Sequence, residues 1–124
     1  MSSRSEDNSA IKGVLRAEGA AIAALGLWLY AMGGHSWGLL AVLILAPDLA
    51  MIGYARGPRA GAICYNLAHS YVTAAAVLVV GLWTGSDTAM ALGLIWGIHI
   101  GADRALGYGL KYQSGFKDTH LERV

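Results

Sequence analysis

Four long apolar segments alternate with short polar or glycine-containing links along this chain. Stretches such as AAIAALGLWLYAM and AAAVLVVGLW are apolar on every side, whereas a surface helix of a soluble protein keeps one polar stripe facing water. A helix needs about 20 apolar residues to cross a hydrocarbon core of about 30 Å. The pattern therefore predicts four membrane-spanning helices, at Val14–Met32, Trp37–Tyr54, Ala60–Trp83 and Thr88–Leu110.

The links between these segments are short, and each contains a Gly or Pro turn signal. Short links join neighbouring helices antiparallel, which favours an up-down-up-down bundle. We therefore expect an all-α fold, with a single four-span transmembrane domain over residues 1–124. A polar N-terminal segment at 1–12 and a polar tail at 112–124 flank it. The links are Gly33–Ser36, Arg56–Pro58 and Gly85–Asp87.

The composition supports a membrane protein, because 56% of the 124 residues are hydrophobic and the mean hydropathy is +0.48. All nine Lys and Arg residues fall at one face of the predicted bundle, and the links at 33–36 and 85–87 contain none. The positive-inside rule assigns that face, with both termini, to the cytoplasm. The net charge of +1 gives no indication of a nucleic-acid partner, so the lipid bilayer is the expected partner. The first segment resembles a signal peptide in its basic flank, but Glu18 and a poor cleavage pattern favour a retained span.

Small residues recur at every fourth position of the last segment, which creates a ridge that lets another helix approach closely. We expect this ridge to pack within the chain, and a homodimer through Gly93, Gly97 and Gly101 is the alternative. Pro47 lies inside the second segment, where it removes a backbone donor and predicts a kink. The ridge consists of Gly93, Gly97, Gly101, Ala105 and Gly109.

Charged residues are rare in this chain, yet five acidic or histidine residues lie within the predicted spans: Glu18, Asp48, His69, His99 and Asp103. A charged group near the bilayer centre costs about 2.5–3.5 kcal/mol, so such groups usually face the interior of a bundle and serve a function. At 1.5 Å per residue, their depths range from roughly 9 Å for Glu18 to roughly 18 Å for His99. The five residues are therefore expected in one layer of the cytoplasmic half.

The spacing of these residues points to a shared site. Asn66 and His69 are three residues apart, and His99 and Asp103 are four apart, so each pair shares one helical face. Two imidazoles with two carboxylates suit Zn²⁺, or an iron or manganese ion. We expect Asp48, His69, His99 and Asp103 to be the metal ligands. The other roles expected are Glu18 as base, Arg104 and Lys111 as binders of an anionic headgroup, and Asn66, Tyr65 and Tyr108 as neighbours of the ligands.

Each residue also has a simpler interpretation. A single membrane histidine more often makes an interhelical hydrogen bond, and Asp103 beside Arg104 could form an ion pair near the interface. Asp48 could cap the kinked backbone, and Glu18 could pair with a nearby cation. Their convergence on one layer favours a functional site over these separate explanations.

Three functions from different classes fit this layer. The first is a metal-dependent hydrolase that acts on a lipid or amphiphile, since bound metal makes water acidic enough to attack near neutral pH. The second is a proton-coupled transporter with His69, His99 and Asp103 as a relay, although the outer half offers only hydroxyls. The third is a haem-binding or structural subunit of a membrane complex.

Three strings carry a family resemblance: LAPDLAMIGY at 45–54, GAICYNLAHSY at 61–71 and HIGADRALGYGLKYQSGFKDTHL at 99–121. Together they resemble a family of small bacterial four-span membrane proteins of unknown function. The resemblance implies a multi-pass protein of the bacterial inner (cytoplasmic) membrane and brings no activity with it. A looser similarity exists to membrane-bound metal-dependent hydrolases, which also place His and Asp on apolar helices but have fuller histidine patterns.

Overall fold

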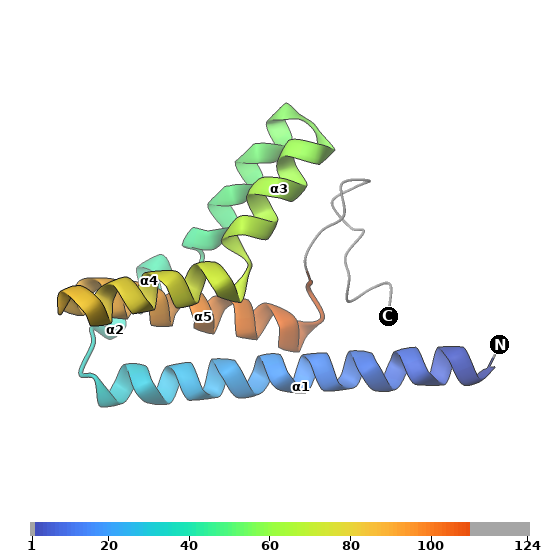
Figure 1. Ribbon diagram of the computed structural model, residues 1–124, viewed down its shortest axis with the longest axis horizontal. Helices are drawn as coiled ribbons and strands as arrows, with labels where there is room; N and C mark the ends of the chain where they lie inside the picture. The colour runs from blue at the N-terminus through green and yellow to red at the C-terminus, as the bar shows by residue number, and fades with distance from the viewer. Residues whose placement is uncertain (1, 110–124) are drawn as a thin grey trace.

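The computed structural model describes residues 2–109, in which the regular elements are all helices and no strand occurs (Figure 1). The predicted all-α fold is therefore confirmed. The elements are α1 Ser2–Met32, α2 Trp37–Leu43, the 3₁₀ helix η1 Ala46–Arg56, α3 Pro58–Ala68, α4 Tyr71–Thr84 and α5 Asp87–Leu106.

Three helices form a layer from which a helical hairpin departs. α5 packs along both α1 and α4. η1 and α3 pack against each other and stand away from this layer at an angle, as Figure 1 shows. The chain is thus not a set of four rods that stay parallel over their full length.

Two helical segments are long and apolar enough to cross a membrane, Glu6–Met32 and Trp37–Arg56. The pair Pro58–Ala68 and Tyr71–Thr84 makes a third if its two helices, bent by 43°, count as one span. Among the described residues α5 does not meet the same criteria. The structure therefore supports two to three candidate spans, while the fourth span and the cytoplasmic termini stay predictions.

The ends of the outer helices differ from the predicted boundaries. α1 begins at Ser2 and runs for 31 residues, so residues 2–12 of the polar segment continue the first predicted span as helix. α5 ends at Leu106, where Gly107 closes the helix with a left-handed φ of 97° that favours glycine. The predicted end at Leu110 lies outside the described residues.

The second predicted span breaks where the kink was expected. α2 ends at Leu43, and η1 begins at Ala46 with Pro47 in its first turn. The backbone N–H of Asp48 donates to the carbonyl of Leu45 at 3.0 Å, as in a 3₁₀ turn. In an α-helix this N–H would bond to Ile44 instead, so the break leaves the carbonyl of Ile44 open to a partner from elsewhere.

The third predicted span, Ala60–Trp83, is not one straight helix, because the chain breaks at His69 and Ser70 between α3 and α4. Such a break leaves the last carbonyls of α3 without partners inside the helix. Side chains replace those partners, which is how membrane proteins tolerate broken helices. The donors are Thr73 to the carbonyl of Leu67, Trp96 to that of Ala68 and Arg104 to that of His69.

Two glycines of the small-residue ridge bring neighbouring helices close to α5. A Cβ on Gly101 would lie 2.6 Å from the carbonyl oxygen of Gly19 on α1, and a Cβ on Gly93 would lie 2.7 Å from the backbone nitrogen of Leu78 on α4. A Cβ on Gly97 would meet no atom within 4 Å. Gly93 and Gly101 therefore pack within the chain, and the homodimer through this ridge stays a prediction.

Candidate metal centre

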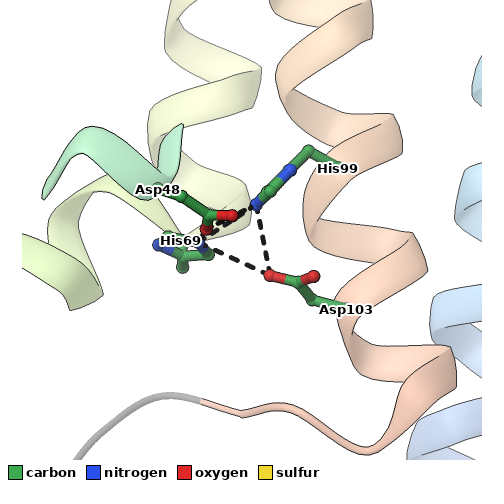
Figure 2. A group of neighbouring side chains, drawn as sticks. All are labelled: Asp48, His69, His99 and Asp103. Atoms are coloured by element: carbon green, nitrogen blue, oxygen red, sulfur yellow. Dashed lines mark hydrogen bonds and ion pairs between the residues drawn. The ribbon is translucent and has the colours of Figure 1, made fainter. Parts of the chain in front are cut away.

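The two helix breaks and one face of α5 bring four ligand-type side chains together. Asp48 lies in the first turn of η1 and His69 caps the end of α3, while His99 and Asp103 lie one turn apart on α5. Figure 2 shows Asp48 and His69 meeting the pair from α5, with their polar ends directed at a common point. One ligand atom from each residue lies within 4.8 Å of all the others, so the group could hold a metal ion.

Five of the six distances among these four atoms lie near those of a tetrahedral coordination shell, and the sixth, between the two carboxylate oxygens, is within 4.8 Å. Nε2 of His69 and Nε2 of His99 are 3.1 Å apart, and Oδ1 of Asp48 lies 2.9 and 3.1 Å from them. Oδ2 of Asp103 lies 3.5 and 3.2 Å from the same two nitrogens. Zn²⁺ binds His and carboxylate ligands at about 2.0–2.2 Å, which places tetrahedral ligand atoms about 3.3–3.6 Å apart. The five distances fall at or slightly below that spacing.

Hydrogen bonds to the backbone determine which nitrogen of each imidazole faces the cluster. Nδ1 of His69 lies 2.9 Å from the carbonyl oxygen of Tyr65, and Nδ1 of His99 bonds to that of Ile44. A carbonyl only accepts, so Nδ1 carries a proton in both rings, and each imidazole in its neutral form presents a lone pair at Nε2. Metal-binding histidines commonly have such a second hydrogen bond, which fixes their tautomer and orientation.

Four acceptors therefore converge without a donor of their own. Two lone-pair nitrogens and two carboxylate oxygens repel one another at these distances, unless a cation or shared protons lie between them. Burial in a medium of low dielectric constant strengthens that repulsion. The arrangement is suited to holding a positive charge at its centre.

The cluster is closed on its imidazole side and more open on its carboxylate side. His69 and His99 are buried, and the ring of Tyr65 stacks on that of His69 with 3.7 Å between centroids and 9° between planes. The side chains of Asp48 and Asp103 are 33% and 19% exposed. An ion or a small molecule would therefore reach the centre past the carboxylates.

Arg104 lies beside the cluster, but its contacts differ from those expected of a headgroup binder. Its side chain is buried, and Nη2 donates to the carbonyl of His69 at 3.1 Å, while Nη1 donates to that of Tyr108 at 3.3 Å. The guanidinium carbon also lies 5.7 Å from the ring centroid of Tyr71. Both of these hydrogen bonds of Arg104 thus go to backbone carbonyls. Headgroup binding by this residue stays a prediction.

The remaining predicted residues are spread more widely. Glu18 is exposed on α1, and this helix contributes none of the four ligand atoms. Asn66 is half-buried on α3, and Tyr108 has an exposed side chain and meets Arg104 through its carbonyl. Lys111 lies outside the described residues. The expected roles of these four residues stay predictions.

Tyr65, which was expected beside the ligands, does support His69 through its carbonyl, but the sequence did not indicate two other supporting residues. Ile44 supports His99 through its carbonyl, and Trp96 closes the end of α3 through its indole N–H. Pro47 was the one available signal for Ile44, because a proline frees carbonyls in the preceding turn. No local pattern around Trp96 indicates its partner 28 residues earlier.

A family model described as Domain of unknown function (DUF4260) matches residues 12–124. The chain belongs to the DUF4260 family. The match includes all four ligand-type residues of the cluster. No curated protein and no solved structure matches this DUF4260 chain. The family description assigns no activity, so the function of the DUF4260 chain has to be argued from the geometry of its site.

Proposed function

We propose that the chain is an integral membrane metalloprotein in which Asp48, His69, His99 and Asp103 bind one divalent ion. The observation that carries the proposal is the convergence of four acceptor atoms within 4.8 Å of one another, with both Nδ1–H groups engaged elsewhere. Of the candidate ions, Zn²⁺ fits this arrangement better than manganese, which favours six oxygen ligands. Iron is the second candidate.

Membrane insertion is the other part of the proposal. Large apolar side chains such as Trp83, Val42 and Val72 are 76–88% exposed, which suits contact with acyl chains. The distribution of the basic residues supports a multi-pass protein of the bacterial inner membrane with cytoplasmic termini. The cluster would then lie in the cytoplasmic half of the bilayer.

The more specific function proposed is hydrolysis of a lipid or amphiphile. A bound divalent ion would supply a water molecule acidic enough to attack near neutral pH. Catalytic sites need an open ligand position, and the exposed carboxylate of Asp48 is the ligand best placed to move aside. Substrate would approach along the carboxylate side, because both imidazoles are buried.

A structural ion is the second candidate function. Four protein ligands complete the shell of a structural zinc site, and here they come from three elements, η1, α3 and α5. A haem between the two histidines is disfavoured, because Nε2 atoms 3.1 Å apart leave no room for a macrocycle.

Elemental analysis of the protein purified without chelators tests the proposal. We expect about one zinc or iron ion per chain in the wild type and almost none in the His69→Ala and His99→Ala variants, because each change removes a ligand. His35→Ala is the matched control, since His35 lies in the link after α1 and outside the cluster. A wild type that holds no metal and takes up no added Zn²⁺ or Co²⁺ would refute the metal centre.

A further inference from the structure

Arg104 is a buried cation that donates a hydrogen bond to the backbone carbonyl of one proposed metal ligand, His69. It is 7% exposed, and burial of a guanidinium is costly unless its N–H groups are paired. Its hydrogen bonds go to two backbone carbonyls, those of His69 and Tyr108. The carbonyl of His69 lies at the C-terminal end of α3, where the helix dipole favours a cation.

The bond to His69 differs from the other bonds that close the broken helix. Thr73 and Trp96 bind the carbonyls of Leu67 and Ala68, which belong to residues outside the ligand set. Arg104 binds the peptide of the ligand residue itself. His69 is therefore held at two separate points: its carbonyl oxygen accepts from Arg104, and its Nδ1 donates to the carbonyl of Tyr65.

The same arginine is anchored on the helix that carries the other imidazole. Arg104 follows Asp103 directly and lies five residues after His99 on α5. Its hydrogen bond thus links the backbone of His69, at the end of α3, to α5. This link joins the backbone of one imidazole-bearing residue to the helix that carries the other.

The positive charge of Arg104 should lower metal affinity, whereas its hydrogen bond to the carbonyl of His69 should raise it. A fixed positive charge near the centre repels a divalent ion, so its removal alone would strengthen metal binding. Loss of a group that orients a ligand weakens metal binding, commonly by 10–100-fold. The two effects differ in sign, which allows a measurement to separate them.

We propose that Arg104 is a positioning residue of the metal centre, which sets the place of His69 relative to His99 and Asp103 by holding the carbonyl of His69. This inference rests on the proposed metal site. It assigns Arg104 a role in metal affinity and coordination geometry through the backbone, without contact with the ion.

Titration of the metal-free, full-length protein in detergent with Co²⁺ tests the inference, because the visible bands of Co²⁺ report both affinity and coordination geometry. We expect Arg104→Gln to weaken Co²⁺ binding by about tenfold or more and to change the visible spectrum. Arg104→Lys should be intermediate, because one ammonium group keeps the charge but cannot reproduce the fork that reaches two carbonyls. Helix content and thermal unfolding are measured for each variant without metal.

Arg16→Gln is the matched control. Arg16 also donates to a backbone carbonyl of α5, that of Ala105 at 2.9 Å, but it is exposed and contacts none of the four ligands. We expect this variant to bind Co²⁺ with wild-type affinity and spectrum. A tenfold loss in Arg16→Gln equal to that in Arg104→Gln would overturn the inference, since a general effect on α5 would then explain both.

The other outcomes are equally decisive. A wild type that binds no Co²⁺ removes the metal site and, with it, the inference. A wild type that binds Co²⁺, with an Arg104→Gln variant that binds as tightly or more tightly, leaves the metal site standing and overturns the positioning role. If Arg104→Gln does not fold, Arg104→Lys decides, and an unchanged affinity and spectrum in that variant overturns the inference.

Discussion

The two imidazoles of the cluster are oriented by carbonyls of different origin. Nδ1 of His69 bonds within its own turn to Tyr65, four residues earlier, whereas Nδ1 of His99 reaches Ile44, 55 residues earlier in the chain. The orientation of His69 is therefore local, but that of His99 requires the break between α2 and η1. The sequence could predict the four ligand-type residues, because their spacing and depth follow from helix geometry. It could not predict which nitrogen faces inward, because that depends on carbonyls freed by the tertiary fold.

Metal binding should weaken as the pH falls. Both Nε2 atoms must be unprotonated to bind an ion, so protons compete with the metal below the ordinary histidine pKa of about 6.5. Binding then releases protons, and the dissociation constant should rise with decreasing pH. Co²⁺ titrations between about pH 5.5 and 8 check this, the range being centred on that ordinary pKa. A dissociation constant that stays constant across the range would contradict binding through the imidazoles.

At the scale of the elements, α5 contributes more to the site than any other described helix. It carries two ligands, packs against α1 and α4, and supplies Trp96 and Arg104 to the broken end of α3. The kink near Pro47 could be predicted, because proline acts through its own ring and missing N–H. The break at His69 could not, because that segment contains neither Pro nor Gly near the break, and donors on other elements stabilise it.

The close approach of α1 and α5 should make Gly101 sensitive to substitution. In Gly101→Ala the new Cβ would lie 2.6 Å from the carbonyl of Gly19 and 2.8 Å from the backbone nitrogen of Ala23, and backbone atoms cannot move aside cheaply. We expect a loss of about 1–3 kcal/mol in the free energy of unfolding. Unfolding of the protein in detergent, followed by circular dichroism, measures it.

Gly97→Ala is the control on the same helix, four residues earlier. A Cβ there meets no atom within 4 Å, and alanine is a better helix former than glycine. We expect no loss of stability, and at most a gain of about 0.5–1 kcal/mol. Equal destabilisation by the two substitutions would show that α5 tolerates no added methyl group and would contradict the specific contact with Gly19.

In the whole molecule, the cluster lies where the hairpin of η1 and α3 joins the layer of α1, α4 and α5 (Figure 1). Asp48 and His69 belong to the hairpin side, and His99 and Asp103 belong to the layer. The hairpin joins α2 at one helix break and α4 at the other, and hinge motions commonly occur at such ends of elements. A bound ion would therefore fix the angle between hairpin and layer.

Distances across the bend between α3 and α4 should become better defined when metal binds. Cys64 is the single cysteine of the chain and is exposed on α3, so it accepts a spin label. Trp83 is exposed on α4, so Trp83→Cys provides the site for a second label. We expect a narrower distance distribution with Zn²⁺ than without it. The same pair of labels in a His99→Ala background should show no response. Identical distributions with and without metal in the wild-type background would rule out a metal-dependent hairpin angle.

The length of α1 has a further consequence for how the molecule fits its surroundings. A helix of 31 residues is about 46 Å long, and at the usual tilt of about 20° it still exceeds a hydrocarbon thickness of about 30 Å by more than two turns. Its N-terminal turns extend past the end of α5 in Figure 1. That polar overhang can take up differences in bilayer thickness while Gly19 stays in register with Gly101, so the protein should suit thin and thick membranes alike.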